Sequence, residues 1–407
     1  MQPRPSRIGA AIVRWQRSHG RHALPWQGTR DPYRIWVSEI MLQQTQVAAV
    51  IPFYERFVAR LPDVRALAEA DLDAVLGLWS GLGYYGRARN MYRCAQQIVQ
   101  AHGGSFPRSA EALAALPGIG RSTAAAIAVF AFGERAAILD GNVKRVLARR
   151  FGVDGYPGTS AVQRRLWALA EQQLPVRDVR AYTQGLMDLG ATVCTRVAPR
   201  CESCPLARGC VARIEARTGE LPHPRPARSV PERAVAMLMI ECGDRLLLER
   251  RPPEGVWGGL WSLPEIPLAA SSPPAREDAG RPPGRGRAGA DRFAARRRKD
   301  RPAGERIAAP AIAAAVASRF GLRVKQVEPL EPFRHAFTHF RLHVEPWRVA
   351  AEFEPQVREP GALWLEFEEA MQAALPQPVR RLLQAHARAC LRAPGAPAES
   401  AATTPGA

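Results

Sequence analysis

The sequence has no run of about 18 apolar residues, the minimum for a membrane-spanning helix, although 46% of it is hydrophobic. Its basic first residues also lack the long apolar stretch and small-residue cleavage site of a secretory signal. Acidic residues are outnumbered by basic ones, 38 to 57, which gives a formal net charge of +19. These features predict a cytoplasmic protein that does not enter membranes and that has polyanionic partners.

Cysteine is sparse as well, and its distribution disfavours a secreted disulfide framework. The chain has seven cysteines, an odd number, and four of them fall within 17 residues: Cys194, Cys201, Cys204 and Cys210. Four thiolates on one short loop suit either a tetrahedral zinc ion or an iron–sulfur cluster. The ligand count therefore predicts a metal site without naming the metal.

Strand-like alternation of apolar and polar residues is nearly absent from the first half of the chain. From about residue 6 to residue 213, apolar residues recur every three or four positions, as in the stretch 32–50. This periodicity is typical of helices. We therefore expect an all-α domain over residues 1–213, with the cysteine loop at 194–210 near its end.

The second half of the chain has a different character. A linker rich in proline and arginine is expected at 214–231. After it, the segments 233–251 and 333–349 alternate as paired strands do, which predicts an α+β domain over residues 232–385. Two further segments are too rich in small and polar residues to form a core and are expected to be disordered, an insertion at 269–306 and a tail at 392–407.

Two glycines stand at the start of a predicted helix in the stretch LPGIGRSTAAA, residues 116–126. In a helix–Gly-x-Gly–helix turn, backbone N–H groups face outward at the positive end of the second helix dipole. No side chain then keeps a phosphate from reaching them. Gly118 and Gly120 are therefore candidate contacts for a nucleic-acid backbone. An ordinary turn between two helices is the alternative.

The cysteine spacing and the LPGIG turn together resemble the endonuclease III family of DNA glycosylases, which carry a helix-hairpin-helix element. The stretches SEIMLQQTQV at 38–47 and LDGNVKRVL at 139–147 resemble the adenine glycosylase branch, the MutY family, and the likeness extends over nearly the whole chain. The resemblance implies that the four cysteines hold a [4Fe–4S] cluster. It also implies a monomeric base excision repair enzyme that releases adenine mispaired with 8-oxoguanine or guanine in double-stranded DNA.

The residue two positions after the second glycine divides the family. Bifunctional members carry a lysine there, which forms a Schiff base with the sugar, whereas this chain has Ser122. The resemblance therefore implies a monofunctional glycosylase, with Ser122 at the base-binding site. Two alternatives stay open, an endonuclease III-like glycosylase with lyase activity and a non-enzymatic iron–sulfur protein that binds DNA.

Two carboxylates stand where the expected chemistry needs them. Glu39 has apolar neighbours, IWVSEIML, which should raise its pKa and keep it protonated near neutrality. Asp140 lies at a predicted helix start, where an ionised carboxylate could stabilise a sugar cation. The resemblance makes Glu39 the acid, Asp140 the cation stabiliser and Asn142 an assisting group. Taken alone, Glu39 could be an exposed helix residue and Asp140 a helix N-cap.

The target base is stacked within a duplex, so it must be flipped out and its place filled. In the family this falls to a Gln after the catalytic Glu and to a Tyr in a glycine-rich turn. The corresponding residues and their neighbours here are Gln43, Gln44, Thr45, Leu82 and Tyr84. Nearby Arg87 and Arg89 are expected to be solvated or to contact phosphate.

The second domain resembles the Nudix fold through the stretch GVWGGLWSLPE at 255–265. The helix after it lacks the acidic cluster that binds Mg²⁺ in Nudix hydrolases, so we expect the fold without that chemistry. Residues Phe337, Thr338 and His339 resemble the Phe-Ser-His segment with which the family recognises 8-oxoguanine. Threonine keeps the hydroxyl of the usual serine and adds a methyl group.

Overall fold

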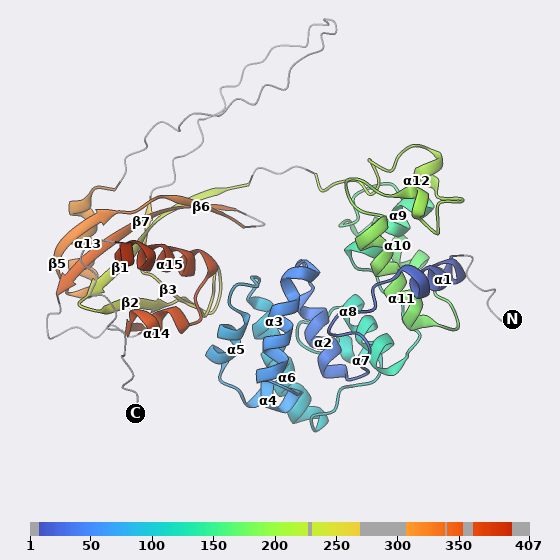
Figure 1. Cartoon of the computed structure of the whole chain (residues 1–407), viewed down its shortest axis with the longest axis horizontal. Coiled ribbons are helices and arrows are strands. Elements are labelled where there is room, and N and C mark those ends of the chain that lie inside the picture. Colours follow the sequence, from blue (N-terminus) through green and yellow to red (C-terminus); the bar gives the residue numbers. More distant parts are fainter. Residues whose placement is uncertain (1–7, 227–229, 269–306, 338–339, 353–360, 393–407) are drawn as a thin grey trace, which may run out of the picture. The chain divides into compact units, whose positions relative to one another are not determined.

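The computed structural model describes residues 8–226, 230–268, 307–337, 340–352 and 361–392. The chain divides into two compact units (Figure 1). The helical unit comprises Met1–Arg228 with the short segments Pro253–Leu260 and Ala374–Gln377, and the remainder forms the second unit. No described helix is long and apolar enough to cross a membrane. The expected insertion at 269–306 lies outside the described residues, as do Thr338, His339 and the expected tail at 392–407 apart from its first residue, Arg392.

The helical unit consists of short and medium helices joined by turns. Its first part contains α1 (Gly9–His19), α2 (Pro32–Met41), α3 (Val47–Arg60), α4 (Val64–Glu69), α5 (Leu72–Trp79), α6 (Gly86–His102) and α7 (Ala110–Ala114). Its second part contains α8 (Arg121–Ile127), the π-helix η1 (Ala128–Phe132), α9 (Gly141–Phe151), α10 (Ser160–Gln173) and α11 (Val179–Asp188). It ends with the π-helix η2 (Leu189–Val193), the 3₁₀ turn η3 (Cys201–Ser203) and α12 (Val211–Ile214).

Helix α2 shows how the sequence sets these boundaries. The Asp31 side chain accepts a hydrogen bond from the backbone N–H of Tyr33, and Pro32 occupies the first helical turn, where its missing N–H costs nothing. The helix ends at Met41, and Gln44 adopts a left-handed conformation with φ 58°. The apolar periodicity at 32–50 therefore belongs to two helices, α2 and α3, because the polar residues 43–46 between them have no apolar side chain to bury.

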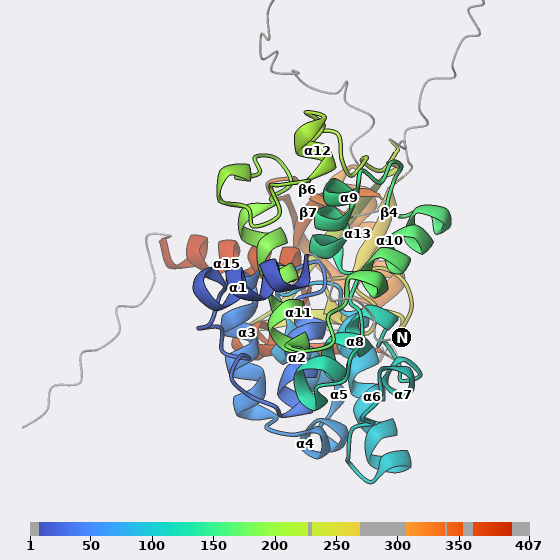
Figure 2. The ribbon, with the colours of Figure 1, turned by 90° about the vertical axis from the view of Figure 1, so that its right-hand side faces the viewer.

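The core of the helical unit's second part lies among α1, α11, α9 and α10, each of which contacts the next in this order (Figure 2). Fully buried apolar side chains fill it, including Ile12, Val143, Leu147, Leu166 and Leu189. The π-helices η1 and η2 extend α8 and α11 directly, and such insertions into helices are frequent at functional sites. This packing fixes the start of α9, where Asp140 lies, against the end of α11.

The second unit is a mixed β-sheet with helices. Its strands are β1 (Glu232–Cys242), β2 (Arg245–Arg250), β3 (Trp261–Ser262), β4 (Glu265–Leu268), β5 (Arg323–Pro329), β6 (Phe333–Ala336), β7 (Arg341–Glu352) and β8 (Ala362–Glu366). The main order is β3-β2-β1-β7-β5; β4 pairs with β1, β6 with β7 and β8 with β2. Strands β1 and β7 are parallel, with Leu238 opposite Trp347, and the other pairs are antiparallel.

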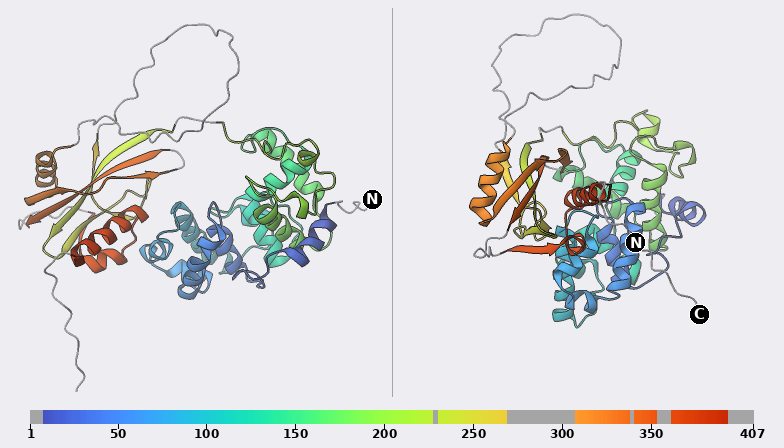
Figure 3. Two further views of the ribbon diagram at one scale, coloured as in Figure 1. Left: turned by 45° about the horizontal axis from the view of Figure 1, so that its top comes forward. Right: turned by 60° about the vertical axis from the view of Figure 1, so that its left-hand side comes forward.

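Helices cover both faces of this sheet (Figure 3). Five successive residues of β1, at 236–240, are buried, as expected for a strand between two layers. Helix α13 (Ala309–Phe320) packs Ile312 and Val316 against one face. The helices α14 (Phe367–Gln372) and α15 (Gln377–Arg392) follow the last strand. The fold class expected from the sequence, an all-α unit followed by an α+β unit, is confirmed.

Candidate active site

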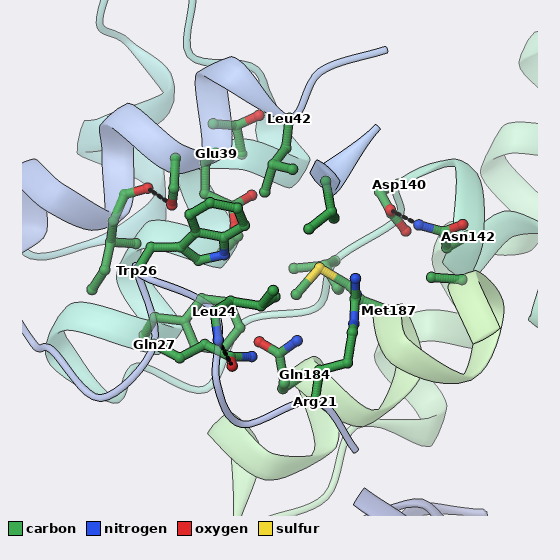
Figure 4. A pocket seen from close by; sticks show the side chains of 18 of the residues that line it. Arg21, Leu24, Trp26, Gln27, Glu39, Leu42, Asp140, Asn142, Gln184 and Met187 are labelled. Atoms are coloured by element: carbon green, nitrogen blue, oxygen red, sulfur yellow. Dashed lines mark hydrogen bonds between the residues drawn. The ribbon is translucent and has the colours of Figure 1, made fainter. Parts of the chain in front are cut away.

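A cavity of about 840 Å³ opens within the helical unit. It is lined by the loop before α2, by α2 itself, by the loop after it, and by residues of α8, α9 and α11 (Figure 4). Its volume lies within the range usual for small-molecule sites. Seven of the residues singled out from the sequence line this one cavity: Glu39, Gln43, Gln44, Thr45, Ser122, Asp140 and Asn142.

Glu39 projects into the cavity from α2 (Figure 4). Burial, and after it the negative charge of Asp140, raises the pKa of the Glu39 carboxyl to about 8. The carboxyl is therefore mostly protonated at neutral pH and is able to donate a proton. The influence of Asp140 also shows that the two carboxyl groups lie close enough to interact.

Asp140 is the N-cap of α9. Its Oδ1 accepts a hydrogen bond from the backbone N–H of Val143 at 2.8 Å, and its Oδ2 accepts one from Asn142 Nδ2 at 3.1 Å. Burial raises the pKa of Asp140, whereas these donors and the positive charge of Arg145 oppose the rise by favouring the ionised form. The Asp140 carboxyl group therefore caps α9 and also lines the cavity, so the two interpretations of this residue do not exclude each other.

Asn142 links Asp140 to the segment that precedes the cysteine loop. Its Oδ1 accepts a hydrogen bond from Arg145 Nη2 at 2.8 Å, and the same Nη2 donates to the carbonyl of Gly190 at 2.7 Å. Arg145 Nε donates to the carbonyl of Cys194, also at 2.7 Å. Sequence reasoning missed Arg145, although its position one helical turn beyond Asn142 places both on one face of α9.

Ser122 lies in the cavity wall, on the first turn of α8. Its hydroxyl oxygen accepts a hydrogen bond from the backbone N–H of Leu139 at 2.9 Å. Leu139 immediately precedes Asp140, so Ser122 helps to hold the segment that carries the aspartate. This contact is invisible in the sequence, because it joins residues 17 positions apart.

The two glycines of the hairpin turn differ in what they require. Gly118 has φ 75°, and a Cβ there would lie 2.6 Å from the Cβ of Asn90, so a side chain is excluded by conformation and by packing. Gly120 is the N-cap of α8, without a side-chain cap, and a Cβ there would meet nothing within 4 Å. The surface at Gly120 is therefore open to an external group, and contact of the two glycines with a nucleic-acid backbone stays a prediction.

The loop after α2 and the turn before α6 hold the residues expected to enter DNA. Gln44 and Tyr84 both have left-handed backbones, φ 58° and 51°, and Tyr84 is 45% exposed, whereas Leu82 is buried. Gln43 Nε2 donates to Thr123 Oγ1 of α8 at 3.3 Å, which ties this loop to the hairpin. The expectation that Arg87 is solvated or contacts phosphate is wrong, because its guanidinium is partly buried and bonded to backbone carbonyls.

The four clustered cysteines are free, partly buried thiols on one loop. Burial and the neighbouring thiols raise the pKa of Cys204 to about 11, which places the sulfurs within electrostatic reach of one another. Arg149 Nη1 lies 3.4 Å from Cys194 Sγ and donates to the carbonyl of Thr195. The donor set fits a thiolate-bound cluster, although no group of three or more Cys, His, Asp or Glu side chains in the described residues is placed to hold a metal ion.

Other residues of the cavity gave no signal in the sequence. Trp26 is buried and packs edge-on against Tyr54, which gives the cavity an aromatic wall. Arg21 forms an ion pair with the fully buried Asp188, with Nε and Oδ1 2.7 Å apart, and Gln184 Nε2 also donates to that Oδ1. Their roles follow from tertiary packing, because they belong to segments distant in the chain.

In the second unit, Phe337 and Phe340 stack with ring centroids 4.4 Å apart, and the N–H of Phe337 donates to the carbonyl of Phe340. These two residues flank Thr338 and His339, which lie outside the described residues. The sequence of α13, APAIAAAVASRF, contains no acidic residue.

Residues 37–189 match the family model described as HhH-GPD superfamily base excision DNA repair protein, and residues 235–385 match the NUDIX domain model. Over 375 residues, the chain is 30% identical to the adenine DNA glycosylase of Buchnera aphidicola subsp. Acyrthosiphon pisum (strain APS). The aligned region covers 92% of this chain and 95% of that protein. The chain belongs to the adenine DNA glycosylase family. The adenine DNA glycosylase of Homo sapiens is 32% identical, over 92% of this chain and 73% of its own length.

Among solved structures, a thermostable thymine-DNA glycosylase aligns with 31% sequence identity and a TM-score of 0.47, covering 51% of this chain and 95% of that one. Membership of the adenine DNA glycosylase family makes the protein a hydrolase of base excision repair, as the sequence predicted. The non-enzymatic alternative is therefore wrong.

Proposed function

We propose that this enzyme removes adenine from double-stranded DNA in which the adenine is paired with 8-oxoguanine or guanine, and that it does so by hydrolysis alone. The observation that carries the proposal is the cavity that brings Glu39 and Asp140 together in different environments. Glu39 has a pKa raised to about 8, whereas Asp140 receives hydrogen bonds that favour its charged form. Such a pair can supply an acid and an anion at the same pH.

In the proposed reaction, the Glu39 carboxyl donates its proton to N7 of the flipped adenine. The bond between N9 and C1′ of the sugar then breaks, and its electron pair leaves with the base. The Asp140 carboxylate stabilises the positive charge that develops on the sugar, held in place by Asn142 and Val143. Water adds to C1′, and its proton returns to Glu39, so that the products are adenine and an abasic site.

The absence of a lysine at position 122 supports hydrolysis without strand cleavage. Ser122 has no amine to attack the sugar, and its hydroxyl is already an acceptor for the N–H of Leu139. Lys144 is a nearby amine in the chain, on the first turn of α9. A glycosylase with lyase activity, the alternative, would need Lys144 or another lysine as its nucleophile.

The proposed contacts to DNA are supported by the family and by the open surface at Gly120. The hairpin turn would bind a phosphate through backbone N–H groups, while Gln44 and Tyr84 would occupy the space that the flipped base leaves. A [4Fe–4S] cluster would stabilise the fold of the loop and contribute to the electrostatic field around it. Its ligands would be Cys194, Cys201, Cys204 and Cys210. The bound partner is expected to be one duplex per monomer, with the lesion recognised through Phe337, Thr338 and His339.

The proposal is tested by single-turnover assays on duplexes with adenine opposite 8-oxoguanine, adenine opposite guanine, and cytosine opposite 8-oxoguanine. We expect alkali-dependent strand scission at adenine in the first two duplexes and none in the third. Glu39→Gln should abolish release while DNA binding persists, because the amide keeps the shape but cannot deliver a proton. Glu55→Gln, an exposed change on α3, is the matched control and should leave release intact.

Two results would contradict the proposal. Release of adenine by the Glu39→Gln variant at a rate near that of the unmodified enzyme would remove Glu39 from the acid role. Efficient trapping of a covalent protein–DNA complex by borohydride would show an amine nucleophile and hence lyase chemistry; Lys144→Ala would then test whether Lys144 is that nucleophile.

A further inference from the structure

Arg87, the second residue of α6, forms an unusual set of internal contacts. Its guanidinium donates to four backbone carbonyls and one hydroxyl, all from two short segments. Nη1 donates to the carbonyls of Ile40 at 2.9 Å, Met41 at 2.8 Å and Gln43 at 2.6 Å, and Nη2 donates to Thr45 Oγ1 at 3.2 Å and to the Gly83 carbonyl at 3.1 Å. The first segment ends α2 and leads into α3, and the second is the turn before α6.

The same guanidinium lies close to two aromatic rings. Its central carbon is 5.4 Å from the centroid of the Trp79 ring and also 5.4 Å from that of Tyr84, within the range of cation–π attraction. Burial lowers the pKa of Arg87 to about 10, which still leaves it fully charged at neutral pH. One cation therefore joins the carbonyl-rich end of α2 to the exposed tyrosine.

These contacts bracket the two left-handed residues. Gln44 lies between Gln43 and Thr45, both bonded to Arg87, and Tyr84 follows Gly83 and places its ring against the guanidinium. A left-handed backbone is strained in a residue other than glycine and persists only where its surroundings enforce it. The contacts of Arg87 reach both segments at once.

We propose that Arg87 is a positioning residue that holds Gln44 and Tyr84 as one rigid wedge before DNA binds. The inference rests on the proposed function, in which these two side chains fill the space left by the flipped adenine. A preformed wedge enters the base stack without first losing conformational freedom, so less of the binding free energy is spent on ordering the protein. Because Arg87 also bonds to the end of α2, the wedge and the helix carrying Glu39 keep a fixed separation.

The forked geometry of arginine is essential to this role. Lysine at position 87 would keep a positive charge, but its single ammonium group cannot reproduce the two planar sets of donors that serve both segments. Arg87→Lys therefore separates the wedge function from charge. A matched control is Arg135→Lys, because Arg135 also donates to two carbonyls, those of Leu174 and Pro175, but lies away from both wedge segments.

The experiment compares two substrates under single-turnover conditions. In one, adenine is paired with 8-oxoguanine; in the other, adenine faces an abasic site, so that no partner base has to be held once adenine leaves the stack. Arg87→Lys should slow release from the paired substrate at least about tenfold, the effect expected from losing one charge-assisted hydrogen bond. Release from the substrate with the abasic site should fall less than about threefold, because no base pair has to be broken and no partner base has to be held when the adenine flips out.

A double-variant comparison strengthens the test. Arg87→Lys should have little further effect in an enzyme that already carries Gln44→Ala and Tyr84→Ala, because residues that act as a unit are not additive. The pH profile of release should match between Arg87→Lys and the unmodified enzyme, and Arg135→Lys should behave like the unmodified enzyme on both substrates.

Equal slowing on both substrates, or full additivity with the double alanine variant, would overturn the inference and make Arg87 a structural residue only. An unchanged rate on the paired substrate would also overturn it. If Arg87→Lys unfolds, Arg87→Gln, which keeps a planar donor, replaces it in the same comparison. Failure of the proposed function would look different, because the unmodified enzyme would then release no adenine from either substrate.

Discussion

At the scale of a single residue, the carboxyl group of Glu39 has very different pKa values in the folded protein and in the unfolded chain. Its position in the cavity raises its pKa to about 8, so it is protonated where an ordinary glutamate is ionised. In the unfolded chain the same carboxyl would ionise near its ordinary value of 4.5. Between these two pH values, unfolding therefore releases a proton, and the stability of the folded protein falls as the pH rises.

Glu39→Gln should consequently stabilise the enzyme near neutral pH while abolishing release. We expect a gain of about 1–3 kcal/mol at pH 7.5 that shrinks towards zero as the pH falls below 4.5, where the folded and the unfolded states of the unmodified enzyme both hold the proton. Adenine release by the native enzyme should decline as the pH rises through about 8. Melting temperatures of both proteins across this range check the first expectation, and a stability difference independent of pH would contradict it.

The residues that could be predicted from the sequence are those whose types carry chemistry. Glu39 was identified by its apolar neighbours and Asp140 by its place before a helix, and both line the cavity. Arg87 could not be identified in this way, because arginine next to glycine and tyrosine is compatible with a solvated surface. Its function as a link depends on carbonyls more than 40 positions away, which no local pattern reveals.

At the scale of elements, α9 connects the two halves of the proposed site. Its N-terminus carries Asp140, and Arg149 near its other end is almost completely buried beneath the cysteine loop. Arg149 Nε donates to the carbonyl of Leu221 at 2.7 Å, and its other nitrogens donate to the carbonyls of Thr195 and Arg196. The helix thus fixes the backbone on which the proposed cluster ligands stand.

Arg149→Lys should therefore weaken retention of the proposed cluster. Lysine cannot donate to three carbonyls in a plane, so the loop should open more readily and release iron during aerobic dialysis. The measurement is iron content and the visible absorbance of purified protein over time, with Arg135→Lys as the control. Retention equal to that of the unmodified protein would show that the cysteines alone hold the loop.

The elements themselves were largely predictable, with one instructive difference. The apolar periodicity of 32–50 correctly indicated helix, but α2 ends at Met41 and α3 begins at Val47. Periodicity records which residues can be buried, and Ile40, Met41 and Val50 are indeed buried on both sides of the break. It does not show where the helix stops. Beyond the end of α2, Arg87 donates to the carbonyls of Ile40 and Met41 in place of the backbone N–H groups that a longer helix would supply.

At the scale of the whole molecule, we expect the two units to carry out different parts of the proposed function. The cavity and the cysteine loop belong entirely to the helical unit. Guanine and 8-oxoguanine differ at N7 and C8, and oxidation turns N7 from an acceptor into a donor. A hydroxyl oxygen can distinguish the two, and Thr338 supplies one within the segment that resembles the lesion-recognition element of the family.

Substitutions at position 338 should therefore change preference more than rate. Thr338→Val, which has nearly the same shape without the hydroxyl, should reduce the preference for 8-oxoguanine over guanine by about 5- to 150-fold, the effect of one lost hydrogen bond of about 1–3 kcal/mol. Thr338→Ser is the matched control and should keep the preference. Single-turnover rates and dissociation constants on both duplexes provide the measurement, and an unchanged ratio in Thr338→Val would assign lesion recognition to Gln44, Thr45 and Tyr84.

The capping of α9 by Asp140 limits how this position can evolve. Asparagine would cap the helix as well but would remove the charge proposed to face the sugar, whereas glutamate would keep the charge on a side chain one methylene too long to cap in the same way. Serine and threonine would preserve folding and lose the anion. Each of these substitutions at position 140 thus loses either the helix cap or the negative charge. None of them is expected to be neutral for both folding and repair.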